Sequence, residues 1–217
     1  MIAPVLRPRV LLADDHRLVA EGLKTLLAAH FDLVGVVENG RALIDAAAEL
    51  RPDVIVADIG MPVLNGIDAL AQLRRGGDRV PVVFLTMHRE VGYARRALEA
   101  GASGYVLKHS APTELIAAVR AALEGRKYLT PALAGEILES YKQEPTSSAD
   151  PSASLTTRQR EILQLLAEGH SAKQIGSQLT ISARTVEFHK YQMMEVLGIH
   201  SNADLIHFAI KHGFVEL

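Results

Sequence analysis

The sequence predicts two units of different structural class, an α/β unit followed by a smaller unit made only of helices. From residue 9 to about 125, short apolar and β-branched runs alternate with segments of helical periodicity. Residues 139–154 read ESYKQEPTSSADPSAS, a Ser-, Pro- and charge-rich composition that is typical of an exposed linker. After residue 155 the pattern is helical throughout. We therefore expect a first domain at 9–125, a linker at 126–154 and a second domain at 155–217.

The composition excludes several classes of protein for this chain. A chain of 217 residues with 48% hydrophobic and 22% charged residues has room for two cores. Its formal charge of −2 gives no basic field over the whole molecule, so any contact with nucleic acid must come from a local surface. The chain has no cysteine, which excludes disulfides, Cys-ligated zinc and thiol catalysis. Because there is also no apolar run of membrane-spanning length, we expect a cytoplasmic protein with no membrane partner.

Five β-strands are predicted in the first domain, each a short apolar run. Between them, apolar residues recur with helical spacing, as in Val19, Leu23 and Leu26 or in Ile116 and Val119. Five such βα units predict an α/β fold with a doubly wound, five-stranded parallel sheet covered by helices on both faces. A further helix at 131–141 is expected either to extend this domain or to form part of the linker. The predicted strands are 10–13, 33–37, 54–57, 82–85 and 105–107.

The second domain shows the start and stop signals of four short helices. Thr156 with Gln159, and Ser171 with Gln174, have the spacing of capping boxes, in which a hydroxyl and a side-chain amide satisfy free N–H groups at a helix start. Only three residues, Thr-Ile-Ser, separate the second helix from the third, which predicts a helix-turn-helix. The helices are expected at about 157–168, 172–179, 183–197 and 202–212.

Acidic residues end two strands of the predicted sheet. Asp14 and Asp15 follow the first strand in LLADDH, and Asp58 follows the third. In a doubly wound sheet the carboxyl ends of the strands meet at one crevice, so these three carboxylates should converge there. A divalent cation relieves the repulsion between them, and a set of hard oxygen ligands favours Mg²⁺.

Two more polar side chains end later strands at the same edge. Thr86 follows VVFL and Lys108 follows GYVL. A hydroxyl and an ammonium group beside a metal-bound carboxylate are suited to holding a phosphoryl group on Asp58. A single such residue is usually a turn or a helix cap, but five that each follow a strand in order predict a shared site.

The segments LLADDH, VIVADIGMPVLNGIDAL, VVFLTMH and GASGYVLKHSAPTEL resemble the receiver domain of two-component response regulators, over about residues 9–125. The resemblance implies a flavodoxin-like fold. It also implies that Asp58 is the phosphoacceptor, and that Asp14, Asp15 and Asp58 bind Mg²⁺ together with the backbone carbonyl of Gly60.

The same resemblance assigns roles to the residues that end the later strands. Thr86 and Lys108 are expected to contact the phosphoryl oxygens. Tyr105 matches the switch aromatic of the family, which turns inward when the residue at the position of Thr86 moves toward the phosphate.

The third helix of the second domain has two different faces. Val186, Met193 and Leu197 form its buried stripe. An exposed Phe and Tyr on the opposite side are unusual, and they would suit a thymine methyl group or a sugar edge in the major groove of DNA. The outward residues are Arg184, Glu187, Phe188, Tyr191 and Gln192.

Residues 153–215 resemble the LuxR-type DNA-binding domain of the NarL/FixJ response regulators, in register through all four helices. Basic and acidic residues cancel from residue 151 onward, so phosphate neutralisation alone gives modest affinity, and we expect two copies on a two-fold site. By the same resemblance, the outer face of the last helix is where such domains pair. The residues expected to contact DNA are Lys173, Arg184, Thr185, Glu187, Phe188, Lys190, Tyr191 and Gln192.

Together these features predict a phosphorylation-dependent transcription regulator. A sensor histidine kinase, or a small phosphodonor, would phosphorylate Asp58 in the presence of Mg²⁺, and the chain would bind double-stranded promoter DNA as a homodimer when phosphorylated. In the unphosphorylated form the receiver is expected either to cover part of the recognition helix or to prevent dimerisation.

Two alternatives belong to other classes of function. A Mg²⁺-dependent phosphatase with an aspartyl nucleophile would need a second acid near Asp58, whereas Gly60 stands two residues on. A constitutive DNA-binding protein could use its receiver only as a docking module. The complete set of five receiver residues disfavours this second alternative.

Overall fold

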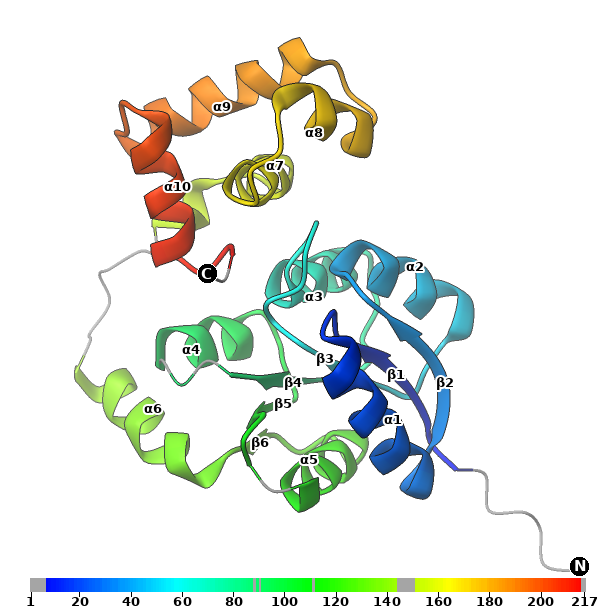
Figure 1. Ribbon diagram of the computed structural model, residues 1–217. Helices are drawn as coiled ribbons and strands as arrows, with labels where there is room; N and C mark the ends of the chain where they lie inside the picture. Colours follow the sequence, from blue (N-terminus) through cyan, green and yellow to red (C-terminus); the bar gives the residue numbers. More distant parts are fainter. Residues whose placement is uncertain (1–6, 88, 90, 111, 144–150, 216–217) are drawn as a thin grey trace, which may run out of the picture.

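The computed structural model describes residues 7–87, 89, 91–110, 112–143 and 151–215. The first domain is built on a parallel sheet with the order β2-β1-β3-β4-β5-β6 (Figure 1). The central strands are fully buried and follow the predicted apolar runs to within one residue at each end. The strands are β1 (Arg9–Ala13), β2 (Asp32–Val37), β3 (Val54–Ala57), β4 (Val82–Thr86), β5 (Gly104–Leu107) and β6 (Tyr128–Leu129).

Helices cover both faces of this sheet, as the βα pattern predicted. One core packs α1 and α5 against side chains such as Leu12 and Val56. The other core packs α2, α3 and α4 against the opposite side chains, such as Leu11 and Ile55. The helices are α1 (Arg17–His30), α2 (Gly40–Leu50), α3 (Gly66–Arg75), α4 (Val91–Glu99) and α5 (Pro112–Leu123).

The sheet has one strand more than the five predicted. β6 pairs in parallel with β5, Tyr128 beside Gly104 and Leu129 beside Tyr105. Two residues are too few to show a strand periodicity, which is why the pattern missed it. The predicted helix at 131–141 is α6 (Pro131–Gln143), and its Leu133 and Ile137 are buried in the core of the first domain. The first part of the expected linker therefore extends the first domain, while residues 144–150 lie outside the described part of the chain.

The second domain has the four predicted helices, preceded by the short 3₁₀ helix η1 (Pro151–Ser154). Both predicted capping boxes are formed, Thr156 with Gln159 and Ser171 with Gln174. Thr180 ends α8 in the left-handed conformation, and the Ser182 side chain caps α9, so the three-residue turn fits between them. The helices are α7 (Thr157–Ala167), α8 (Ala172–Leu179), α9 (Ala183–Leu197) and α10 (Asn202–Lys211).

The two domains touch through α7, which lies over α3 and the loop that leads into it (Figure 1). α9 lies on the far side of α7 from the receiver sheet. In the described residues, no helix combines the length and apolarity needed to cross a membrane.

Candidate functional site

Sheet register places the acidic residues next to one another. Ala13 of β1 pairs with Ala57 of β3, so Asp14 and Asp58, which follow these residues, leave neighbouring strands at the same level. The Asp58 N–H donates to the carbonyl of Ala13 at 2.8 Å and holds the two strand ends together. Ligand atoms of Asp14, Asp15, His16 and Asp58 all lie within 4.8 Å of one another. The expected convergence of the three carboxylates is therefore present.

Lys108 holds two of these carboxylates together. Its Nζ lies 2.9 Å from Asp14 Oδ2 and also forms an ion pair with Asp58 Oδ2. Asp14 and Asp58 are almost completely buried. Burial lowers the pKa of Lys108, but the nearby carboxylates, Asp58 above all, outweigh this effect and raise the pKa above its ordinary value. Lys108 is therefore cationic at neutral pH and offsets the repulsion between the acids.

Thr86 and Tyr105 lie on the two strands beyond Asp58. Thr86 is the last residue of β4 and pairs with Leu107, and its carbonyl accepts the Lys108 N–H at 2.7 Å. Both Thr86 and the Tyr105 ring are fully buried. The structure therefore has Tyr105 in the inward position.

The loop between Asp58 and α3 is tightly constrained. The Ile59 N–H donates to Asp58 Oδ1 at 2.7 Å and fixes the side chain of Asp58. Gly66 starts α3 so close to β3 that a Cβ there would meet the carbonyl oxygen of Asp58 at 2.2 Å. Val63 has φ of +68°, in the left-handed region that a β-branched residue rarely adopts.

The donor set fits a hard divalent cation. Asp15 Oδ1 is buried and has no hydrogen bond within the described residues, although His16 Nδ1 lies 3.0 Å away. Gly60 lines the same hollow as Asp15 and His16. An orphaned carboxylate oxygen beside two further carboxylates is the environment that Mg²⁺ favours. Sequence reasoning gave no role to His16, although it directly follows Asp15 in LLADDH and shares the cluster.

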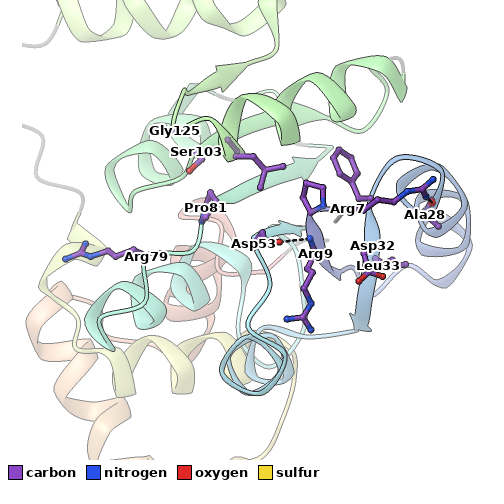
Figure 2. Close-up of a pocket in the computed structure, with 14 residues that line it drawn as sticks. Arg7, Arg9, Ala28, Asp32, Leu33, Asp53, Arg79, Pro81, Ser103 and Gly125 are labelled. Carbon is purple, nitrogen blue, oxygen red and sulfur yellow. Dashed lines mark hydrogen bonds between the residues drawn. The ribbon is translucent and has the colours of Figure 1, made fainter. Parts of the chain in front are cut away.

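A second hollow, of about 1230 Å³ and larger than the one lined by Gly60, Asp15 and His16, opens at the opposite end of the sheet, where the strands begin (Figure 2). Two of its polar lining residues are already bonded: the Arg9 N–H donates to Asp53 Oδ2 at 2.7 Å, and the Arg9 side chain donates to the carbonyl of Arg51. Parallel sheets carry their sites at the other edge, so this hollow is separate from the acidic crevice.

The outward face of α9 is exposed as predicted except at Glu187, which is half-buried, and Leu197 of the predicted buried stripe is also only half-buried. Val186 and Met193 are buried, whereas Phe188 is 57% and Tyr191 64% exposed. Arg184, Gln192 and, on α8, Lys173 are also exposed. The α9 residues follow the helical period onto one face, so the helix presents a mixed polar and aromatic surface to the solvent.

Three predicted DNA-contacting residues, all on α9, are partly buried and already bonded within their own helix or its cap. Lys190 is only 9% exposed, and its Nζ forms an ion pair with Glu187 Oε2 at 2.6 Å. Thr185 is half-buried, and its N–H donates to the capping Ser182 Oγ at 3.0 Å. Glu187 is therefore neutralised within its own helix, which reduces its repulsion of a phosphate backbone.

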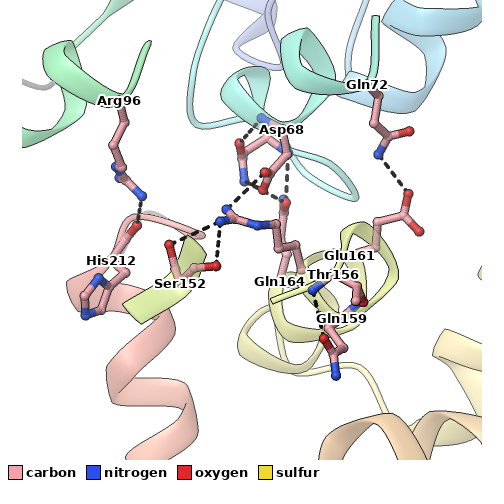
Figure 3. Close-up of polar contacts among 11 residues, drawn as sticks. Asp68, Gln72, Arg96, Ser152, Thr156, Gln159, Glu161, Gln164 and His212 are labelled. Atoms are coloured by element: carbon pink, nitrogen blue, oxygen red, sulfur yellow. Dashed lines mark hydrogen bonds and ion pairs between the residues drawn. The ribbon is translucent and has the colours of Figure 1, made fainter. Parts of the chain in front are cut away.

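Polar contacts that the sequence did not reveal join α7 to the receiver domain (Figure 3). The side chain of Gln164 is buried. Its Nε2 donates to the carbonyl of Met61 at 2.8 Å, and its Oε1 accepts the Asn65 N–H at 2.8 Å. Glu161 accepts from Gln72 Nε2 at 3.0 Å and forms an ion pair with Arg41. The receiver thus contacts α7 and leaves Arg184, Phe188 and Tyr191 of α9 exposed, so in this structure it does not cover the recognition helix. The other expectation, that the receiver prevents dimerisation, stays a prediction.

Further contacts extend this interface on either side. Glu168 Oε1 accepts the Val63 N–H at 3.1 Å, and Arg160 forms an ion pair with Asp68 at 3.3 Å. At the end of the chain the carbonyl of His212 accepts from Arg96 of α4 (Figure 3).

Comparison with known families assigns both domains. The family model of the response regulator receiver domain matches residues 10–120. The family model of the bacterial regulatory proteins, luxR family, matches residues 153–209.

Two curated relatives match nearly the whole chain. The chain is 34% identical over 209 residues to the response regulator UvrY of Escherichia coli K12, a match that covers 94% of each chain. It is 33% identical over 211 residues to the response regulator GacA of Pseudomonas aeruginosa, covering 96% of this chain and 98% of GacA.

One solved structure is similar over nearly the whole chain and another over 63% of it. RcsB of Salmonella enterica serovar Typhimurium, bound to the promoter P1flhDC in the presence of the phosphomimetic BeF3⁻, is 28% identical with a TM-score of 0.58, covering 93% of this chain and 97% of RcsB. A LuxR-family two-component response regulator from Aurantimonas sp. SI85-9A1 is 35% identical with a TM-score of 0.60, covering 63% of this chain and 99% of that one.

Proposed function

Because the chain belongs to the response regulators that join a receiver domain to a LuxR-type DNA-binding domain, and is thus a transcription regulator and not an enzyme, we propose that phosphorylation of Asp58 controls its binding to promoter DNA. The family decides against the phosphatase alternative. The observation that carries the proposal is the cluster of Asp14, Asp15 and Asp58 within 4.8 Å, in contact with Lys108.

The proposed reaction is transfer of a phosphoryl group from a phosphohistidine of a sensor kinase. A carboxylate oxygen of Asp58 attacks phosphorus, the P–N bond breaks, and the imidazole leaves and takes up a proton. Lys108 and Thr86 then contact the oxygens of the phosphoryl group. Thr86 and Tyr105 are both buried and lie on the adjacent strands β4 and β5, which supports the expectation that movement of the hydroxyl is transmitted to the ring.

Mg²⁺ is the proposed cofactor of this step. Asp14, Asp15, Asp58 and the carbonyl of Gly60 would hold it, and when bound it supplies the positive charge that lets a phosphoryl group approach the carboxylates. The orphaned oxygen of Asp15 supports this assignment.

The DNA half of the proposal uses α9 in the major groove. Exposed Arg184, Phe188, Tyr191 and Gln192 would contact the bases and the backbone, with Lys173 of α8 on the phosphates. The balanced charge of the domain favours a homodimer on a two-fold site. RcsB, whose two dimers are bound to two parallel DNAs in a solved structure, gives a precedent for this assembly.

The partners are a sensor histidine kinase and double-stranded promoter DNA, the protein acts in the cytoplasm, and no membrane is involved. We propose 9–125 as the receiver and 155–217 as the DNA-binding domain, with β6 and α6 of the expected linker 126–154 packed on the receiver.

A gel shift against genomic fragments, with and without a small phosphodonor and Mg²⁺, tests the proposal, and sequencing of the retained DNA gives the site. We expect phosphodonor to increase retention of fragments that carry a two-fold site, and Asp58→Ala to abolish the increase. If Asp58→Ala leaves both DNA binding and regulation unaltered, the receiver is only a docking module.

A further inference from the structure

The DNA-binding domain forms one wall of the hollow beside the acidic cluster. This hollow, of about 340 Å³, is lined by Asp15, His16 and the loop 60–62 from the receiver. Its other wall consists of residues of α7, of the loop after it and of the C-terminal segment. These are Gln164, Glu168, Phe214 and Val215.

The same domain satisfies the backbone of the loop that frames the cluster. Gln164 and Glu168 bond the carbonyl of Met61 and the N–H groups of Val63 and Asn65. These three backbone groups belong to the segment that joins Asp58 to α3. The DNA-binding domain therefore supplies hydrogen-bond partners to three backbone groups of this loop.

A small phosphodonor and a protein phosphodonor meet this arrangement differently. The side chain of His16 is 56% and that of Asp15 28% exposed, so a small molecule can approach the cluster from their side. The side chain of Asp58 is 3% exposed, and its ligand atom lies within 4.8 Å of theirs. A protein donor must bring its phosphohistidine in line with Asp58, and a specific protein contact covers about 800 Å² on each partner. Such a partner needs the rims next to Asp58, and α7 occupies the rim formed by 61–65.

We propose that α7 is a lid over the input side of the receiver, which has to swing away before a phosphohistidine-bearing protein reaches Asp58, whereas a small phosphodonor reaches it with the lid closed. The contact therefore determines which phosphodonors can phosphorylate the chain. It leaves the reading face of α9 exposed. This inference rests on the proposed role of Asp58 as phosphoacceptor.

The test compares rates of phosphorylation of the full chain by two donors, phosphoramidate and a phosphorylated kinase core chosen because it labels the wild-type chain. Gln164→Ala with Glu161→Ala removes the central lid contacts, and Gln178→Ala on the exposed face of α8 is the matched control. We expect the double variant to gain about tenfold in rate with the kinase core and less than about twofold with phosphoramidate, because only the first donor depends on the open population. Equal changes in the rate of phosphorylation by the two donors would refute the proposal that α7 is a lid.

A cross-link provides the opposite perturbation. The chain has no cysteine, so Gln72→Cys with Glu161→Cys introduces the only two thiols, at positions whose native side chains bond at 3.0 Å. Closing them with a reducible bifunctional reagent should lower the rate with the kinase core about tenfold or more, spare the rate with phosphoramidate, and be reversed by reductant. An unchanged rate with the kinase core would refute the lid. Loss of labelling by both donors in Asp58→Asn checks the acceptor separately, and persistent labelling there would refute the proposed function instead.

Discussion

The acidic crevice takes its side chains from the ends of four strands between residues 14 and 108, whereas the reading face of α9 takes them from one helix between residues 184 and 192. Charges in the crevice are buried and depend on one another, as Lys108 shows by pairing with both Asp14 and Asp58. Side chains on α9 are exposed and mostly independent. Substitutions in the crevice should therefore affect both folding and chemistry, and substitutions on α9 should affect DNA binding alone.

The largest expected effect is that of Asp58→Asn. The amide cannot act as the nucleophile, so phosphoryl incorporation from phosphoramidate, followed by mass spectrometry, should fall below detection. DNA binding of the unphosphorylated chain should not change. Asp45→Asn, on the exposed face of α2, is the matched control and should be labelled like the wild type. Labelling of the Asp58 variant at the wild-type rate would place the acceptor elsewhere.

Lys108→Met should destabilise the receiver by about 3 kcal/mol in the absence of divalent cation, because it leaves two buried carboxylates without their cation. Urea unfolding measures this loss, and added Mg²⁺ should restore part of it. Since the raised pKa keeps Lys108 charged, its contribution is present at neutral pH and is lost only as the pH rises through that pKa, so the effect should be constant from about pH 6 to 8.

Lys127→Met, on an exposed loop residue, is the control for Lys108→Met. It should change stability by less than about 0.5 kcal/mol. Equal losses of stability in the two variants would show that Lys108 does not stabilise the buried carboxylates. The charges of the crevice would then be as independent of one another as those on α9.

Arg184→Ala should weaken binding to the specific DNA site by about tenfold, or roughly 1.4 kcal/mol, without changing the rate of phosphorylation. Fluorescence anisotropy at several salt concentrations separates a phosphate contact, which reduces the salt slope, from a base contact, which relaxes specificity. Lys127→Ala removes an equal charge from the receiver and should leave affinity unchanged. Slower phosphorylation of the Arg184 variant would contradict the independence of the two regions.

The smallest effect is expected at Val63, in the loop that links the crevice to α7. Asn tolerates the left-handed conformation better than a β-branched residue, so Val63→Asn should raise stability by about 0.5 to 1 kcal/mol in thermal unfolding. Val196→Asn, at an exposed position in α9, should instead lower it slightly. A loss at position 63 larger than at 196 would show that the packing of Val63 outweighs its backbone strain.

The crevice could be predicted from the sequence because each of its residues directly follows or ends a strand. Asp14, Asp58 and Lys108 needed only the order of the strands to be placed together. The strand β6 could not be predicted, because two residues carry no periodicity.

The contact between the domains was equally hidden from the sequence. Gln164 lies in an ordinary helical run, LQLLA, and its partners are the backbone atoms of Met61 and Asn65, which have no side-chain signature. The strain at Val63 also depends on backbone angles that no local pattern specified. Sequence reasoning was therefore reliable where topology alone brings residues together, and it failed where two separately folded surfaces meet.

The uncovered face of α9 has a consequence for how the regulator finds its target. If α9 reads DNA as proposed, a helix that is accessible in the unphosphorylated chain would allow short, non-specific encounters with the chromosome. Phosphorylation would then not need to unmask the helix. It would act on how long a pair of molecules stays at a promoter, and occupancy would respond through residence time and not through the search.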